Sequence, residues 1–180
     1  YEKKSRIFAA MTEQSHKYGF VSIIGKPNAG KSTLMNALVG KKLAITTHKA
    51  QTTRHRILGI ANADDYQIVF SDTPGVILPQ YRLHRMMMNA VHSSLEDADV
   101  IILLVDVNET FPEDLVYNLA NKAEVPTLLV LNKVDKGDAE PDRALDECFD
   151  LFANLGADDN QLDFPAMYAS GRIKSLANER

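Results

Sequence analysis

The stretch GKPNAGKS at residues 25–32 decides the fold of this chain. It matches the pattern G-x-x-x-x-G-K-[ST], whose glycines let consecutive backbone N–H groups curl around phosphate groups. The apolar residues 20–24 before it predict a short buried strand, and the apolar spacing of residues 31–39 after it predicts a helix that ends at Gly40. A strand, this turn and a helix together are typical of a nucleoside triphosphate site.

The residue types in this turn indicate how the phosphates would be held. Backbone N–H groups of the turn point inward, and the N-terminus of the helix adds the positive end of its dipole. Lys31 can reach the β- and γ-phosphates, and the hydroxyl of Ser32 can bind Mg²⁺. The nucleotide contacts expected from this segment are Asn28, Ala29, Gly30, Lys31, Ser32 and Thr33.

The stretch SDTPGVIL at residues 71–78 follows a second predicted strand at residues 66–70. The carboxylate of Asp72 can hold a water on Mg²⁺, and the backbone N–H of Gly75 can approach a γ-phosphate closely because glycine has no side chain. A simple Pro-Gly turn is the alternative interpretation. Many such proteins carry a Gln at the next position to orient the attacking water, but this chain has Val76, which can orient nothing.

The stretch NKVD at residues 132–135 follows a third predicted strand at residues 127–131. Asp135 can accept hydrogen bonds from both N1–H and N2–H₂ of guanine, whereas adenine would leave this carboxylate unpaired. The aliphatic stem of Lys133 can lie over the base, and Asn132 can brace the phosphate loop. Because ligands bind at the carboxyl ends of parallel strands, the three motifs are expected to converge on one guanine nucleotide.

A basic, threonine-rich segment at residues 44–56 predicts a loop. Thr52 or Thr53 could complete the Mg²⁺ shell and order the loop only when a γ-phosphate is present. The spacing does not decide between the two threonines. An ordinary polar loop is the alternative interpretation.

The composition narrows the class of protein. With 180 residues, 45% of them apolar and 24% charged, the chain suits one compact globular domain. A net charge of −4 argues against a general nucleic-acid coat. The longest apolar runs are too short to cross a bilayer, residues 1–18 show no signal-peptide pattern, and the one cysteine, Cys148, excludes an intrachain disulfide. We therefore expect a cytoplasmic protein without a membrane span.

Strands that alternate with helices predict an α/β fold with a mostly parallel six-stranded sheet and helices on both faces. We expect residues 1–18 to be a flexible extension and residues 19–180 to be one GTP-binding domain. The C-terminal helix, starting near Ile173, is expected to be short or missing. The expected strands are residues 20–24, 57–61, 66–70, 100–107, 127–131 and 164–168, and the expected helices are residues 31–39, 81–95, 113–123 and 142–155.

The motifs in this order resemble those of the Ras-like P-loop GTPases. Residues 19–112 are similar to the G domain of the Era family of ribosome-assembly GTPases, on the segments GFVSIIGKPNAGKSTLMNALVG, KAQTTRHRILGI and IVFSDTPGVILPQ. The resemblance implies that Thr53 binds Mg²⁺ and that Lys31, Thr53 and Gly75 act in hydrolysis. It also implies a ribosomal subunit or its RNA as partner, and a cytoplasmic location, peripheral at the inner membrane. The RNA-binding KH domain of that family is not expected in this chain.

Two further features come from resemblance. The Era class includes GTPases that use K⁺ in place of an arginine finger, with a phosphate-loop Asn as ligand; Asn28 stands at that position, and support of the turn is the alternative role. Residues 132–173 instead resemble the translational GTPase BipA/TypA, so a chimera joined within the fold, natural or engineered, is our interpretation, and an unusual single lineage is the alternative. This resemblance places Ser170 and Gly171 in a loop whose N–H groups reach the guanine O6.

The expected function is slow hydrolysis of GTP to GDP and phosphate with Mg²⁺, as a molecular switch in ribosome assembly or translation. Because Val76 cannot orient water, the rate is expected to depend on a cation or a partner. The alternative is a nucleotide-dependent binding switch, or an engineered chimera, with little intrinsic hydrolysis. The sequence does not indicate an oligomeric state.

Overall fold

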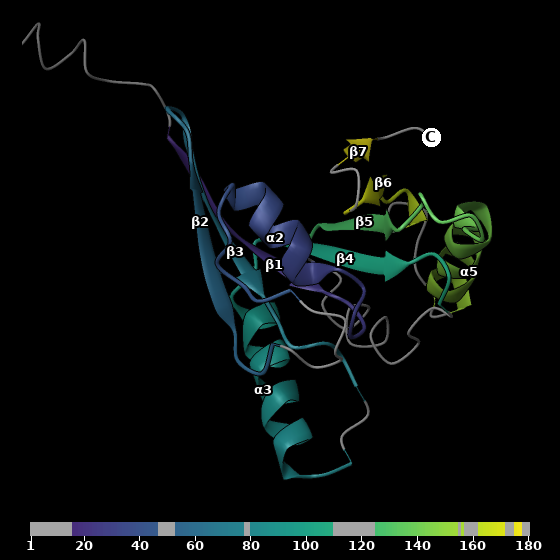
Figure 1. The fold of residues 1–180 in the computed structure, drawn as a ribbon, viewed down its shortest axis with the longest axis horizontal. Helices are drawn as coiled ribbons and strands as arrows, with labels where there is room; N and C mark the ends of the chain where they lie inside the picture. The colour runs from purple at the N-terminus through teal and green to yellow at the C-terminus, as the bar shows by residue number, and fades with distance from the viewer. Residues whose placement is uncertain are drawn as a thin grey trace, which may run out of the picture.

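A computed structural model describes residues 16–46, 53–77, 80–109, 125–154, 156, 162–171 and 175–177. In these residues a seven-stranded sheet runs in the order β2-β3-β1-β4-β5-β6-β7 (Figure 1). The strands are β1 Lys17–Ile24, β2 Ile57–Asn62, β3 Tyr66–Asp72, β4 Val100–Asp106, β5 Thr127–Asn132, β6 Ala166–Ser170 and β7 Ser175–Ala177. The helices are α2 Lys31–Val39, α3 Arg82–Glu96 and α5 Pro141–Asn154.

The predicted mostly parallel α/β sheet is confirmed, with a strand added at one edge. Strands β3, β1, β4, β5 and β6 pair in parallel, whereas β2 and β7 pair antiparallel with their neighbours. The C-terminal helix was expected to be short or missing, and residues 175–177 instead form the strand β7 beside β6. Strand β1 also takes in residues 17 and 18, which the sequence analysis assigned to the extension.

Some expectations fall on parts of the chain that the structure does not describe. The predicted helix at residues 113–123 lies outside the described residues, and so does Thr52. Among the helices that are described, none is long and apolar enough to cross a membrane.

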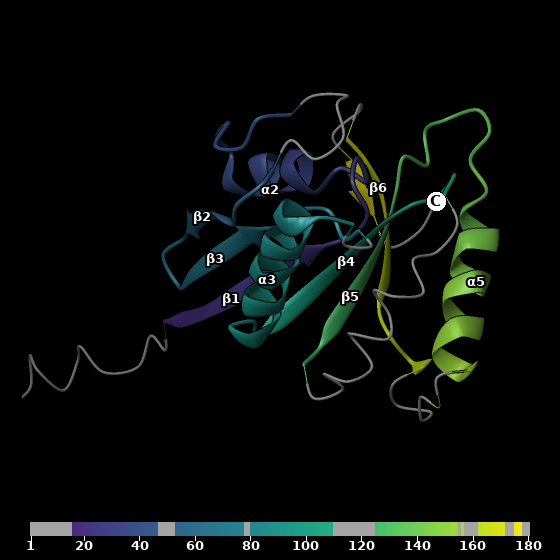
Figure 2. The ribbon, with the colours of Figure 1, turned by 90° about the horizontal axis from the view of Figure 1, so that it is seen from below.

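The helices cover both faces of the sheet, as the alternation of β4 requires (Figure 2). Ile101, Leu103 and Val105 point to the core beneath α3 and α5, and Ile102 and Leu104 point to the core beneath α2. All five of these side chains are buried, which explains why this strand is a continuous apolar run.

The register of the strands brings their carboxyl ends to one edge. Asp72 at the end of β3 lies opposite Ile23 of β1, and Asn132 at the end of β5 lies opposite Asp106 of β4. Helix α2 starts at the same edge, directly after Gly30. The three sequence motifs are therefore carried to one place by the parallel sheet.

A chain of polar side chains, which we call the serine chain, crosses the sheet beneath α3. Its serines are Ser22 of β1, Ser71 of β3 and Ser94 of α3, all buried. The hydroxyl of Ser94 is hydrogen-bonded to that of Ser22 and lies 2.8 Å from that of Ser71. Arg56 donates from Nε to the Ser71 oxygen over 2.8 Å and pairs with Asp97 just past the end of α3.

Candidate functional site

The phosphate loop at residues 25–30 closes around a lysine. Lys31 is buried, and its Nζ donates to the carbonyl oxygens of Gly25, over 3.1 Å, and Lys26, over 2.7 Å. Burial lowers the pKa of the Lys31 ammonium to about 8, although Asp72 and Glu109 oppose that shift. The loop thus holds a cation at the N-terminus of α2, where anions are favoured.

The loop needs glycine at two positions, because the backbone there has a positive φ and neighbouring atoms leave no room for a Cβ. At Gly25, with φ 155°, a Cβ would lie 2.2 Å from the carbonyl oxygen of Leu104. At Gly30, with φ 107°, a Cβ would lie 2.4 Å from the side-chain nitrogen of Asn132. Asn28 also has a positive φ, 62°, a region in which asparagine is tolerated better than most residues.

Three oxygen-bearing side chains meet beside the loop. The Ser32 hydroxyl donates to Oδ2 of Asp72 over 2.6 Å, and the Thr53 hydroxyl donates to the same oxygen over 3.2 Å. Oδ1 of Asp72 is buried and has no hydrogen-bond partner among the described residues. Burial raises the pKa of Asp72, while the hydrogen bond from Ser32 and the charge of Lys31 lower it.

This oxygen cluster fits Mg²⁺, which prefers oxygen ligands and keeps several waters. The unpaired Oδ1 of Asp72 is the acceptor that a metal-bound water would satisfy, and the Ser32 and Thr53 hydroxyls would be the direct ligands. The three residues predicted for the metal therefore lie together, including the threonine that only the resemblance selected.

The segment after β3 is attached to the phosphate loop. A Cβ on Gly75 would lie 2.5 Å from the backbone nitrogen of Pro27, and the N–H of Val76 donates to the carbonyl oxygen of Gly25 over 3.0 Å. The Thr73 hydroxyl donates to the carbonyl oxygen of Ile23 over 2.8 Å. The side chain of Val76 packs against the core beneath α3, so it is a packing residue and not part of the cavity lining.

On the other side of the loop, two side-chain hydrogen bonds fix the base-recognition segment. Asn132 donates from Nδ2 to the carbonyl oxygen of Ala29 over 2.7 Å. The Ser170 hydroxyl donates to Oδ1 of Asp135 over 2.6 Å. Asn132 thus ties β5 to the phosphate loop, and Ser170 orients the carboxylate that sequence analysis assigned to guanine.

Lys133 and Gly171 complete this side. Lys133 has φ 67° and its ammonium forms an ion pair with the carboxylate of Asp106 at the end of β4. A Cβ on Gly171 would lie 3.2 Å from Cγ2 of Thr33, so the end of β6 approaches α2 closely. Lys133 is therefore tied to the end of β4, and Gly171 lies close to the start of α2.

These residues surround one cavity of about 810 Å³, within the range of small-molecule and cofactor sites. Ala29, Asp72 and Ser170, which the sequence analysis also named, are not among its lining residues. The lining includes Asn28, Gly30, Lys31, Ser32, Thr33, Thr53, Gly75, Asn132, Lys133, Asp135 and Gly171, all named by the sequence analysis.

The structure also adds residues that the sequence analysis missed. Asp106, the last residue of β4, and Glu109, which follows that strand, line the cavity together with Ile45, Thr46 and Lys136. The only sequence signal for Asp106 is its position at the end of an apolar strand run, which it shares with Asp72 and Asn132 and which is not a motif by itself. Glu109 lies in an irregular turn, for which the sequence offers no comparable signal.

Comparison with known proteins gives a consistent match. Residues 20–133 match the model of the family described as 50S ribosome-binding GTPase. The chain is 49% identical over 127 residues to the GTPase Era of Lactobacillus helveticus, and 50% identical over 126 residues to the chloroplastic GTPase ERA-like protein of Oryza sativa subsp. japonica. These matches cover 70% and 67% of this chain, but only 42% and 30% of the relatives, so the chain spans less than half of their length.

Solved structures agree with the family match. A crystal structure of Era with MgGDPNP and nucleotides 1506–1542 of 16S ribosomal RNA superposes with a TM-score of 0.75 and 34% identity, over 88% of this chain and 53% of that one. The same values hold for Era of Aquifex aeolicus bound to GDP·AlF₄⁻. The fold, the arrangement of the motifs around one cavity and the family match together show that this chain belongs to the 50S ribosome-binding GTPase family.

Proposed function

We propose that residues 19–180 form a guanine-nucleotide-binding domain that hydrolyses GTP to GDP and phosphate with Mg²⁺. The observation that carries this proposal is that Lys31, Ser32, Thr53 and Asp135 line one cavity, with Asp72 hydrogen-bonded to Ser32 and Thr53. A phosphate-binding end and a base-binding end are thus available to one ligand. The match to Era supports the choice of ligand.

At the phosphate end, the protein groups position and neutralise more than they react. Lys31 offers a buried ammonium to the β- and γ-phosphates, and the N–H groups of Ala29 and Gly30 supply further donors. Ser32, Thr53 and Asp72 would hold Mg²⁺, which supplies charge neutralisation during phosphoryl transfer. Because Gly75 has no side chain, its backbone N–H can approach the γ-phosphate closely.

At the base end, Asp135 would accept two hydrogen bonds from guanine, and Ser170 keeps its carboxylate oriented. Adenine would leave that carboxylate without its donors, which is a strong penalty in a closed site. The stem of Lys133 would lie over the ring, and backbone N–H groups near Gly171 would reach the guanine O6.

The nucleotide retained by the purified protein tests the proposal. We expect denaturation to release GDP or GTP, and we expect Asp135→Ala to abolish that retention. Asp138→Ala is the matched control, because Asp138 is exposed and does not line the cavity. Release of an adenine nucleotide, or equal retention by both variants, would refute the assignment.

Hydrolysis itself is proposed to be slow without help. Val76 packs into the core, so its side chain cannot orient water. Asn28 lines the cavity with an exposed side chain and is proposed to hold K⁺ against the phosphates. We expect faster GTP turnover in K⁺ than in Na⁺ at equal ionic strength, and loss of that difference in Asn28→Ala. Equal rates in the two salts would eliminate the K⁺ role.

The second candidate function is a switch whose hydrolysis needs a partner. The packing of Val76 favours it, because the Val76 side chain cannot orient water. A ribosomal subunit or its RNA is the proposed partner, by analogy with the Era complex containing 16S ribosomal RNA, and a cytoplasmic location follows from that partner. Single-turnover hydrolysis measured with and without small ribosomal subunits distinguishes the two functions. Strong stimulation supports the partner-dependent switch, and no stimulation supports the cation-dependent enzyme.

The origin of residues 132–173 in a translational GTPase also stays a proposal. Era relatives match about 127 residues of the chain, which leaves room for a segment of different ancestry. A comparison restricted to residues 132–173 tests it, because a chimera predicts closer matches to translational GTPases than to Era. Peripheral attachment at the inner membrane is proposed by resemblance alone, and a membrane-flotation assay tests it.

A further inference from the structure

Asp106 is a buried carboxylate at the wall of the nucleotide cavity. Its side chain is 3% exposed, and it stands at the last position of β4, opposite Asn132. Oδ2 pairs with the ammonium of Lys133, and Oδ1 accepts the backbone N–H of Asn108 over 3.2 Å. A carboxylate buried in this way is unfavourable unless a cation and hydrogen-bond donors compensate it, and both are present here.

Lys133 has a backbone conformation that directs it toward Asp106. Its φ of 67° lies in the left-handed region, which residues with a side chain rarely adopt and which the surrounding structure must impose. The Lys133 side chain is 27% exposed and lines the cavity, while its ammonium is held at Asp106. The aliphatic stem between these two points therefore has one end fixed by the turn and the other by the ion pair.

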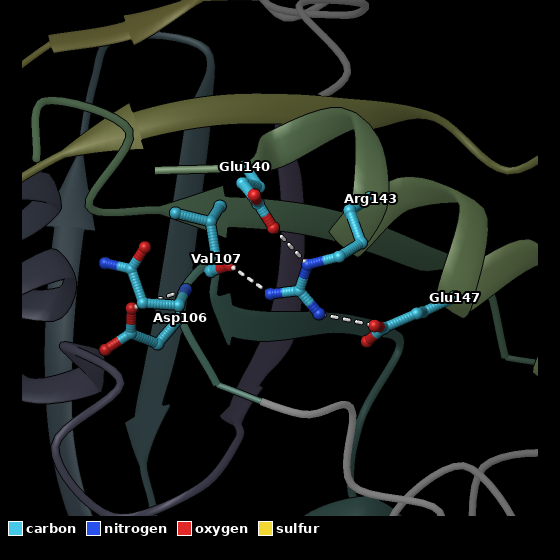
Figure 3. A network of polar contacts seen from close by, with 6 residues as sticks. Asp106, Val107, Glu140, Arg143 and Glu147 are labelled. Atoms are coloured by element: carbon cyan, nitrogen blue, oxygen red, sulfur yellow. Dashed lines mark hydrogen bonds and ion pairs between the residues drawn. The ribbon is translucent and has the colours of Figure 1, made fainter. Parts of the chain in front are cut away.

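The frame around Asp106 is itself braced. The N–H of Val107 donates to the carbonyl oxygen of Asn132 over 3.2 Å, which extends the pairing of β4 and β5 beyond the strands. Figure 3 shows Arg143 of α5, between Glu140 and Glu147, reaching toward the carbonyl oxygen of Val107 beside Asp106. The carboxylate is thus attached to a turn that is held from both sides.

We propose that Asp106 is a positioning residue for nucleotide binding, which anchors the Lys133 ammonium so that the Lys133 stem forms a preformed apolar surface for the face of the purine. This inference rests on the proposed function of the same cavity. Without Asp106, the lysine stem has to be ordered when the nucleotide binds, and the lost side-chain freedom opposes binding. The surface contacts the ring face, so it should strengthen binding without distinguishing one purine edge from another.

Stopped-flow release of fluorescently labelled GDP from the full chain tests the proposal. Asp106→Asn is the informative variant, because the amide oxygen can still accept the Asn108 N–H while the negative charge is lost. We expect GDP release to accelerate roughly tenfold in Asp106→Asn and similarly in Lys133→Met, and we expect the double variant to resemble either single variant, because residues that act as a unit are not additive. Asp138→Asn, which removes an exposed charge that does not line the cavity, should release GDP at the wild-type rate.

Base preference shows whether Asp106 affects contact with the ring face or recognition of the purine edge. Inosine diphosphate lacks the 2-amino group that Asp135 would read. Asp106→Asn should therefore weaken GDP and inosine diphosphate by the same factor, whereas Asp135→Ala should reduce the preference for GDP. Thermal unfolding without nucleotide shows whether Asp106→Asn is folded. If it is not, GDP release from Lys133→Met tests the same ion pair.

Unchanged GDP release in folded Asp106→Asn, or independent additive effects of the two substitutions, would overturn the inference and leave the proposed function intact. Wild-type protein that binds neither diphosphate would overturn the proposed function, and this inference with it.

Discussion

Replacing Gly75 by alanine is expected to slow GTP hydrolysis while GDP binding persists. A Cβ at this position would lie 2.5 Å from the nitrogen, 2.6 Å from Cα and 2.7 Å from Cγ of Pro27. Two of these three atoms are backbone, so the clash cannot be relieved by a side-chain rotation. The segment that carries Gly75 must therefore move away from the phosphate loop.

The size of the effect follows from that movement. Ordinary contact starts near 3.4 Å, so the gap must widen by roughly 1 Å. A misplacement of about 1 Å in a positioning group lowers the rate of a reaction on the order of 100-fold. Because GDP has no γ-phosphate, the moved N–H takes no part in GDP binding. The overpacked contact should also lower the free energy of unfolding by about 1–3 kcal/mol.

Single-turnover hydrolysis of GTP and release of GDP, measured on the same preparations, check this expectation. Gly137→Ala is the matched control, because a Cβ at Gly137 meets nothing within 4 Å. The control should match the wild type in both measurements. Wild-type hydrolysis by Gly75→Ala, or equal losses of hydrolysis and of GDP binding, would refute the assigned role of this glycine.

Two further predictions concern the base end and the core. Ser170→Ala removes the hydrogen bond to Asp135, worth about 1 kcal/mol, and should weaken GDP binding about fivefold in titration calorimetry; unchanged affinity would mean that Ser170 does not orient the carboxylate. Burial raises the pKa of Cys148 from 9.0 to about 12, so the folded chain keeps a thiol proton that the unfolded chain loses. The resulting stabilisation is complete below about pH 9 and is lost as the pH rises toward about 12. Urea unfolding should therefore show a smaller alkaline loss of stability in Cys148→Ala than in the wild type, and equal losses would contradict the shift.

Helix α2 shows where local sequence is sufficient to predict structure. Its bounds, Lys31–Val39, agree with the expectation because a glycine with a positive φ stands at each end, Gly30 and Gly40. Neither glycine depends on distant parts of the chain for its conformational preference. The phosphate loop before it is predictable for the same reason, since its spacing of glycines and lysine has a direct physical purpose.

Strand β7 shows the opposite case. It has three residues, too few for a periodic pattern, and it forms because β6 offers an unpaired edge. The sequence around it indicated at most the start of a short helix. Antiparallel pairing with β6 overrode that weak local preference, as is common for short strands.

Asp106 illustrates what single-sequence reasoning leaves out of a site. An acidic residue at the end of an apolar run is not a motif by itself, and its partner, Lys133, is distant in sequence. Lys133 contacts Asp106 from a left-handed backbone conformation, with φ 67°, which the sequence does not reveal. Functional motifs can be read from spacing, whereas the groups that hold them depend on strand register.

The serine chain has a consequence for how α3 can sit on the sheet. The guanidinium of Arg56 can only donate, so Ser71 accepts from it, and hydroxyl–hydroxyl hydrogen bonds join Ser71 to Ser94 and Ser94 to Ser22. Apolar contacts such as those of Met87 and Leu95 tolerate small displacements of the helix, but these hydrogen bonds do not. A shift of α3 by one residue, about 1.5 Å along its axis and a rotation of about 100°, would turn Ser94 away and leave buried hydroxyls unpaired. The serine chain therefore allows α3 to pack on the sheet in one register and penalises the neighbouring registers.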